Sequence, residues 1–246
     1  MSDACGMWVY AAVPPHSPVP ELTGVAGEPL SVVRASSLGA VVGWVPFTVA
    51  EGDRDRVEGI ARAHHRVVTE LHRHTAVVPF RLGTVVADEA GVGAMLEAYA
   101  SQLLDGIRLA TGRTEWGVKV FLRDVPAQAA GQPAASGGSG KAYLMRRRAE
   151  RQASEVHRHR VAQHADRVHE ALSRYAAVSR RYPAHGPQIA VLNAAYLVPA
   201  DDSSRFVAAV AEVENANPAL RTELTGPWPP YCVAVRLDDR AGAGRR

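Results

Sequence analysis

Ten histidines and two cysteines are the side chains of this sequence that could bind a metal or attack a substrate. A zinc site on one helix needs two ligands on the same face, with a third nearby. Adjacent helical residues point about 100° apart, and ligands on one face are usually four residues apart. The eight histidines in the predicted helices offer no such pair: they are His64 and His65, His72 and His74, then His157, His159, His164 and His169. The sequence therefore predicts surface histidines and no metal site.

Signatures of catalysis are also missing from the sequence. Cys232 lies on a predicted strand between Tyr231 and Val233, which favours a small buried residue over a nucleophile. No GxSxG, HExxH or paired-carboxylate pattern occurs. The segment SGGSGKA, residues 136–142, resembles a phosphate loop, but Ala135 stands where that pattern needs Gly and Ala142 where it needs Ser or Thr. We expect no catalytic residue, no cofactor and no enzymatic activity.

A basic segment covers residues 141–182, with 11 Lys/Arg against 4 Asp/Glu. It contains neither glycine nor proline, which predicts one long helix of about 60 Å. Its arginines are attractive to phosphate or to an acidic protein partner. Aromatic residues do not interleave with them, which favours a solvated face over a nucleic-acid site. The candidate partner-binding residues are Arg146, Arg147, Arg148 and Arg151.

Hydrophobic periodicity and turn residues predict the elements around these groups. In the first half, strands are expected at 7–13, 29–35, 38–46, 76–80 and 114–125, and helices at 55–74 and 88–111. The second half adds strands at 187–199, 219–226 and 231–237 and a helix at 201–215, with Phe206, Val207, Val210 and Val213 turned inward. These elements predict an α+β fold.

The domain organisation follows from a change in composition. Residues 126–140 contain only small residues, Pro and Gln, which is typical of a flexible linker. We expect an α+β domain at 1–125, a second at 141–237 with the long basic helix, and a disordered tail at 238–246. Two distant cysteines and the lack of a long apolar run predict a cytoplasmic protein without a membrane span.

The strand TEWGVKVFL places alternate side chains on opposite faces. Trp116 and Leu122 are expected in the core. Glu115 and Lys119 share the other face, about 13 Å apart, so they do not pair with each other. We hypothesise that Arg81 pairs with Glu115, with simple solvation of Glu115 as the alternative.

The segment GPWPPY, residues 226–231, predicts a rigid corner. Pro227, Pro229 and Pro230 fix φ and remove three donors, so the turn should not extend the sheet. Trp228 would then cap apolar surface by docking a strand against a helix, and Tyr231 would begin the last strand. An exposed Trp228 would instead mark a protein contact.

Five blocks in order resemble the gas vesicle GvpF/GvpL family: AHHRVVTEL, VVPFRLGTVVADEAGV, GRTEWGVKVFL, GKAYLMRRRAER and LTGPWPPYCVAV. The resemblance runs from Trp8 to Leu237. It departs at Leu82, where phenylalanine is common, at His65, where glutamine or glutamate is frequent, and at Cys232, where serine is frequent. The F-like or L-like branch stays open. The motif residues are Pro79, Arg81, Gly83, Thr84, Glu115, Trp116, Lys119, Gly226, Pro227, Trp228, Pro229, Pro230 and Tyr231.

The resemblance implies an N-terminal α+β domain and a C-terminal domain of modified ferredoxin-like type. It also implies an accessory or minor structural protein of gas vesicle formation, without enzymatic activity. The F branch is expected to contact the small hydrophobic shell protein at the gas-facing surface, and the L branch to join other accessory proteins. Our first hypothesis is therefore an assembly protein that binds the shell protein. A nucleic-acid-binding module using the basic helix is the alternative, and a small-molecule enzyme is a third.

Overall fold

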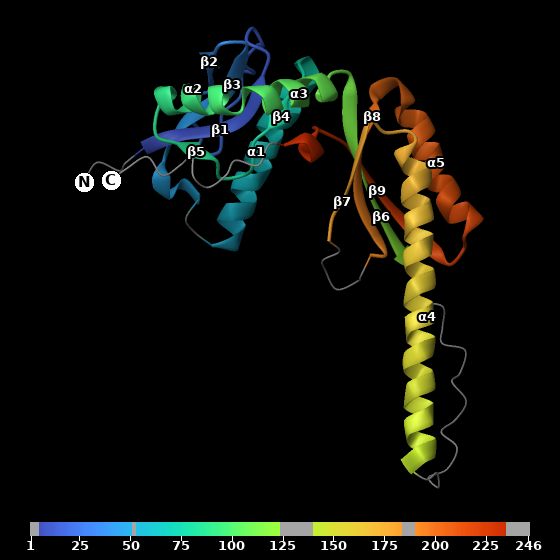
Figure 1. Ribbon diagram of the computed structural model, residues 1–246. Coiled ribbons are helices and arrows are strands. Elements are labelled where there is room, and N and C mark those ends of the chain that lie inside the picture. The colour runs from blue at the N-terminus through green and yellow to red at the C-terminus, as the bar shows by residue number, and fades with distance from the viewer. Residues whose placement is uncertain (1–4, 51–52, 124–139, 184–189, 235–246) are drawn as a thin grey trace. The chain divides into compact units, whose positions relative to one another are not determined.

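The computed structural model describes residues 5–50, 53–123, 140–183 and 190–234. The chain divides into two compact units (Figure 1). Unit 1 contains Met1–Glu115 together with Pro227–Arg246, and unit 2 contains Trp116–Gly226. The sequence placed the first boundary after residue 125, whereas the contacts divide the chain within a strand and return its C-terminal segment to unit 1. The expected linker, apart from Gly140, and the expected tail lie outside the described residues.

Unit 1 is built on an antiparallel sheet. Its strands are β1 (Cys5–Val13), β2 (Ser31–Ala35), β3 (Leu38–Pro46), β4 (Val78–Pro79) and β5 (Val85–Val86). Their order is β2-β3-β1-β4, and β5 also pairs with β1. The predicted hairpin of β2 and β3 is confirmed, and Ser36 supports its turn with a φ of 52°. β1 is apolar almost throughout because both of its faces are buried.

Helices cover both faces of this sheet. α1 (Arg54–His74) packs on one face around Val67, Val68 and Leu71. α2 (Glu89–Ala98) and α3 (Ala100–Ala110) pack on the other. Asp53 caps α1 as predicted, since its side chain accepts from Arg56 N. The single helix expected at 88–111 is wrong: the backbone of Tyr99 leaves the helical region and separates α2 from α3.

A buried polar network lies within unit 1. Trp8 Nε1 donates to His64 Nδ1 over 3.0 Å, and Tyr10 OH donates to Glu28 Oε1 over 2.5 Å. The rings of Tyr10 and His64 stack with centroids 5.3 Å apart. Gly24 is required here because a Cβ would meet the Glu28 carboxylate. Burial lowers the pKa of His64 to about 4, so this imidazole is neutral in the folded protein at neutral pH.

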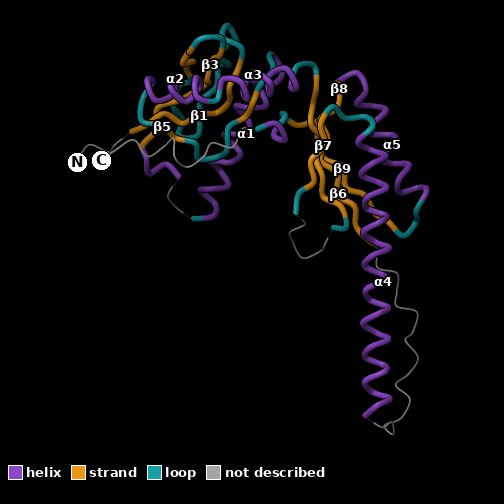
Figure 2. The backbone as a smooth tube through the Cα atoms, in the orientation of Figure 1, coloured by secondary structure: helices purple, strands orange, loops and turns teal. Residues whose placement is uncertain are grey.

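Unit 2 follows the element order strand, helix, strand, strand, helix, strand. Its elements are β6 (Arg113–Leu122), α4 (Gly140–Ser173), β7 (Val178–Arg181), β8 (Leu192–Pro199), α5 (Ser203–Ala216) and β9 (Leu220–Trp228). The sheet order is β7-β8-β6-β9, so β9 is an edge strand. Figure 2 labels these four strands and the two helices beside them. Both helices pack on the same face, where Leu172 of α4 and Phe206 of α5 meet Tyr196 of β8. The expected α+β fold class is confirmed.

Three predicted elements of the second half are corrected by the structure. The helix expected to reach residue 182 ends at Ser173, because Val178–Arg181 pairs with β8 as a strand. The strand expected at 231–237 is wrong over Tyr231–Val233, which forms a 3-10 turn, η3. The strand expected at 219–226 is confirmed as β9 but continues to Trp228. Pro227 is therefore part of the strand, at the end of a sheet edge where proline is tolerated.

Candidate functional site

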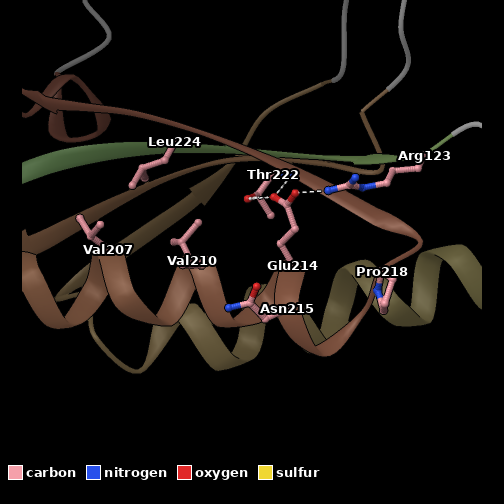
Figure 3. A pocket seen from close by; sticks show the side chains of 9 residues that line it. Arg123, Val207, Val210, Glu214, Asn215, Pro218, Thr222 and Leu224 are labelled. Carbon is pink, nitrogen blue, oxygen red and sulfur yellow. Dashed lines mark hydrogen bonds and ion pairs between the residues drawn. The ribbon is translucent and has the colours of Figure 1, made fainter.

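A groove of about 530 Å³ lies between α5 and β9 in unit 2 (Figure 3). We call it the α5–β9 groove. One end is polar and the other is apolar. Its lining consists of Arg123, Val207, Val210, Ala211, Glu214, Asn215, Pro218, Thr222 and Leu224.

Glu214 organises the polar end of the groove. Its Oε2 accepts from Thr222 N over 3.0 Å and from Thr222 Oγ1 over 2.8 Å. Its Oε1 pairs with Arg123, whose Nε donates to Leu220 O over 2.9 Å. The hydrogen bonds from Thr222, and then the Arg123 charge, lower the pKa of Glu214. The carboxylate is thus held ionised by three donors, which suits a structural anchor better than a proton-transfer group.

The same contacts protect part of the sheet edge. An edge strand exposes backbone groups that can pair with another chain. In β9, however, Glu214 accepts from Thr222 N, and Leu220 N donates to Asn217 O over 2.9 Å. Side chains and a neighbouring loop therefore occupy backbone groups at the start of the edge, which leaves the apolar wall beside it as the accessible feature.

The apolar end combines a buried floor with an exposed wall. Val210 is buried and Leu224 is half-buried, whereas Val207 is 37% exposed. The expectation that Val207 turns inward is wrong, because it lies on the side of α5 that borders the groove. An apolar hollow with a few fixed polar groups is typical of a binding surface. None of the nine lining residues is a cysteine, serine, histidine or lysine that could act as a nucleophile or a neutral base.

The C-terminal strap, residues 227–234, contacts residues of unit 1 that lie far from it in the sequence. Trp228 O accepts from Thr114 Oγ1 over 3.1 Å. Tyr231 OH and His65 Nδ1 are 3.1 Å apart, and the Trp228 ring packs edge-on against the same histidine. Trp228 nevertheless remains 39% exposed. The corner thus docks a strand end against helix α1, as predicted, and also leaves part of its tryptophan at the surface.

Glu115 fixes the strap at its far end. Its Oε2 accepts from Cys232 N over 2.5 Å, and both residues are buried. Burial, followed by the nearby Glu115 charge, raises the pKa of Tyr231. The solvation alternative for Glu115 is therefore wrong. The backbone amide of Cys232 is one partner of this carboxylate, and Arg81, its hypothesised partner, has an exposed side chain.

The RLGT block forms a tight turn between β4 and β5. Pro79 is buried in β4, and Gly83 adopts a φ of 84° that favours glycine. Thr84 closes the turn by donating its N and Oγ1 to Arg81 O over 3.1 and 2.8 Å. Arg81 and Leu82 lie exposed at its tip. Pro79, Gly83 and Thr84 thus have structural roles in this turn, which leaves Arg81 as the motif residue whose side chain has none among the described residues.

The strand motif and the basic cluster differ in burial. Trp116 packs 6.3 Å from the Phe206 ring, whereas Lys119 is exposed. The predicted alternation of core and solvent side chains fails at the end of β6. Leu122 is 40% exposed, whereas Phe121 is buried, and the Arg221 guanidinium lies 4.4 Å from the centre of the Phe121 ring. Arg147, Arg148 and Arg151 are exposed on α4, and the side chain of Arg146 lies outside the described residues.

Sequence reasoning did not find the α5–β9 groove. Arg123 and Glu214 are 91 positions apart, and only the pairing of β6 with β9 brings them together. Within the described residues, no three His, Cys, Asp or Glu side chains gather into a potential metal site. Across the same residues, no helix is long and apolar enough to cross a bilayer.

The fold and the groove define a mixed α+β protein with two antiparallel sheets and an apolar recess anchored by an ion pair. The chain belongs to the gas vesicle synthesis protein GvpL/GvpF family, whose model matches residues 6–232. The recognition made from the motif blocks is confirmed.

Curated relatives and solved structures agree with this family. The chain is 37% identical to gas vesicle protein L of Streptomyces sp. (strain CB03234), over 92% of each chain. It is 28% identical to gas vesicle protein F of the same strain, over 88% of this chain and 93% of that one. The crystal structure of GvpF from Anabaena sp. PCC7120 superposes with a TM-score of 0.72 at 19% identity, covering 95% of this chain and 98% of that one. At that identity the structural likeness establishes the fold.

Proposed function

We propose that this chain is a non-enzymatic accessory or minor structural protein that binds the small hydrophobic shell protein and other accessory proteins during gas vesicle assembly. The family match over residues 6–232 carries this proposal. We place the protein in the cytoplasm at the growing vesicle, with the gas-facing surface as its site in the finished particle. The identity to protein L is higher than to protein F, which favours the L branch and its contacts with other accessory proteins; the shell-protein contact at the gas-facing surface is what the F branch implies.

We infer that unit 2 is a modified ferredoxin-like domain that supplies the contact surface. Its β-α-β-β-α-β element order and its strand order support this assignment. The α5–β9 groove would accept apolar side chains of the shell protein against Val207, Val210 and Leu224. The Glu214 contacts favour side-chain packing over strand addition along the first part of β9, because its Thr222 amide is already occupied.

Co-expression with the shell protein tests this proposal. The tagged chain should retain the shell protein on an affinity resin and keep it in the soluble fraction. Val207→Asp should reduce that recovery, because a charge in the groove would have to lose its hydration against apolar side chains. Leu109→Asp is the matched control, since Leu109 is also 37% exposed and lies on a helix, but in unit 1.

The outcomes separate the function from its location. Failure of the parent chain to retain any vesicle component would contradict the proposed function. Equal recovery with Val207→Asp and Leu109→Asp would leave the function standing and reject the groove as the contact. Both variants sit on exposed helical positions, so circular dichroism should show that each keeps the parental fold.

A further inference from the structure

The contacts between α4 and the rest of unit 2 that the structure describes lie in the C-terminal part of this helix. Ala165, Val168 and Leu172 pack into the core of unit 2. Arg181 pairs with Asp166, and Tyr196 OH lies 2.8 Å from His169 Nδ1. In the described part of the chain, the core contacts, hydrogen bonds and ion pairs that tie α4 to other elements all lie at or beyond residue 165. Figure 1 shows the rest of this helix running beyond the sheet of its unit.

We call residues 140–160 the basic arm. At 1.5 Å per residue it is about 30 Å long. Most helical stability in proteins comes from packing an apolar face against another element. The side chains of the arm that the structure describes are all exposed, Met145 by 62% and Arg147, Arg148 and Arg151 as well. An element of this kind gains stability when a partner covers it.

The charge of unit 2 is concentrated in the arm. Residues 140–160 hold seven Lys/Arg against two Asp/Glu, whereas the rest of unit 2 holds eight of each. The first turn of α4 contains no acidic residue, although the helix dipole favours acids there. The arm therefore carries the whole positive excess of its unit.

The arm arginines also differ from most of those elsewhere in unit 2. Arg123, Arg174, Arg181, Arg205 and Arg221 each form an ion pair. Arg147, Arg148 and Arg151 form none with any other described residue. Arg147 and Arg151 are four positions apart, where like charges repel on a helix. Carboxylates placed opposite them would relieve this repulsion and form bidentate pairs.

We propose that the basic arm is a docking surface for an acidic helical segment of another gas vesicle protein, a proposal that rests on the proposed function above. Charge complementarity identifies the partner: a helix with carboxylates at spacings of three and four would face Arg147, Arg148 and Arg151 together. A protein fits better than nucleic acid. Tyr143 is the one aromatic residue of the arm, residues 145–160 contain no Phe, Tyr or Trp on which bases could stack, and Glu150 and Glu155 would oppose a phosphate backbone. Binding orders the arm and is weakened by salt.

Charge reversal tests the arm. The tagged chain is co-expressed with the other proteins of the vesicle, one at a time, as the parent and as Arg147→Glu, Arg148→Glu, Arg151→Glu. The matched control is Arg54→Glu, Arg56→Glu, Arg180→Glu, which changes the net charge equally at three exposed arginines outside the arm. We expect at least one acidic partner to be lost tenfold or more from the arm variant and retained by the control. Replacing the partner's facing glutamates with lysine should restore its recovery on the arm variant.

Each alternative result has a definite meaning. Parent binding that survives the arm reversal overturns the docking surface but not the proposed function, whereas a parent that retains no vesicle protein contradicts the proposed function. Equal losses of partner recovery in the arm and control variants would mean that only the net charge of the protein matters, and this would overturn the proposal. So would binding of a 20-base-pair duplex that the arm reversal abolishes while every protein is retained. Circular dichroism of both variants shows whether each remains folded.

Discussion

The C-terminal strap is mostly apolar and the basic arm is rich in charged residues, and their polar groups are used in opposite ways. The strap directs its backbone and its Tyr231 hydroxyl toward Thr114, His65 and Glu115 inside unit 1. In the arm, Arg147, Arg148 and Arg151 are exposed and form no ion pair with another described residue. Polar groups that are bonded internally specify the fold, whereas those left unpaired are available to a partner. The two segments therefore make opposite predictions for substitution.

The largest effect that we expect is a loss of folding stability in acid, caused by the buried residue His64. His64 has a folded pKa of about 4 against an ordinary value of 6.5. Below pH 6.5 the unfolded chain therefore binds the proton more readily, and stability falls as the pH drops from 6.5 toward 4. The expected loss is about 3 kcal/mol, because a difference of one in pKa between the folded and unfolded chain is worth about 1.36 kcal/mol. Urea unfolding at pH 7, 5.5 and 4.5 measures it.

A variant separates His64 from the other groups that titrate in this range. Burial also lowers the pKa values of His65, His72 and His169, which act in the same direction. His64→Gln should therefore flatten the pH dependence without removing it. An identical slope in parent and variant would show that His64 is not the main source.

Loss of the strap anchor should have the next largest effect. Glu115→Ala leaves the buried Cys232 amide without this acceptor, which costs about 2–3 kcal/mol. The free energy of unfolding in urea is the measurement. Glu155→Ala, in the exposed arm, is the control and should change it by less than about 0.5 kcal/mol. Equal effects of the two substitutions would erase the distinction between strap and arm.

Removal of the Tyr231 hydroxyl should reduce the free energy of unfolding by a smaller amount. Tyr231→Phe removes the hydrogen bond with His65 but keeps the ring, so we expect a loss of about 1 kcal/mol. Tyr175→Phe is the matched control, because Tyr175 is 39% exposed and makes ring contacts rather than a side-chain hydrogen bond to another described residue. Thermal unfolding of both variants compares them, and an unchanged midpoint for Tyr231→Phe would contradict the assigned bond.

The smallest effect on stability should come from the arm itself. Arg147→Glu, Arg148→Glu, Arg151→Glu should leave the free energy of unfolding of the isolated protein within about 0.5 kcal/mol of the parent, because no packed contact is lost. Urea unfolding monitored by tryptophan fluorescence measures this. A loss above about 2 kcal/mol would mean that the arm packs within the protein, and the contrast with the strap would fail.

Local signals were sufficient for some elements and insufficient for others. Asp53 and the spacing of Val67, Val68 and Leu71 predicted α1, because a cap and an apolar stripe are both properties of neighbouring residues. The end of α4 was missed because Val178–Arg181 becomes a strand through its ladder with β8, a partner more than ten residues away. Helical composition continued through this segment, and the non-local pairing prevailed.

The sites divide in the same way. Gly83 and Thr84 were identified from their motif, and a single turn explains them. Glu115 was correctly singled out as needing a partner, but the Cys232 amide could not be foreseen because 117 positions separate the two residues. The groove required the pairing of β6 with β9 and the position of α5 at once, so no stretch of sequence contained its signal.

The division of unit 1 between two chain segments has a consequence for biosynthesis. Its first part ends at Glu115, and its last part begins at Pro227, after all of unit 2. At about 5–20 residues per second, a ribosome needs roughly ten seconds to make the intervening stretch. Throughout that interval the nascent unit 1 has Glu115 without the Cys232 amide and His65 without its tyrosine cover. The emerging polypeptide thus passes through an incomplete state, which closes only after residues 227–234 have been made.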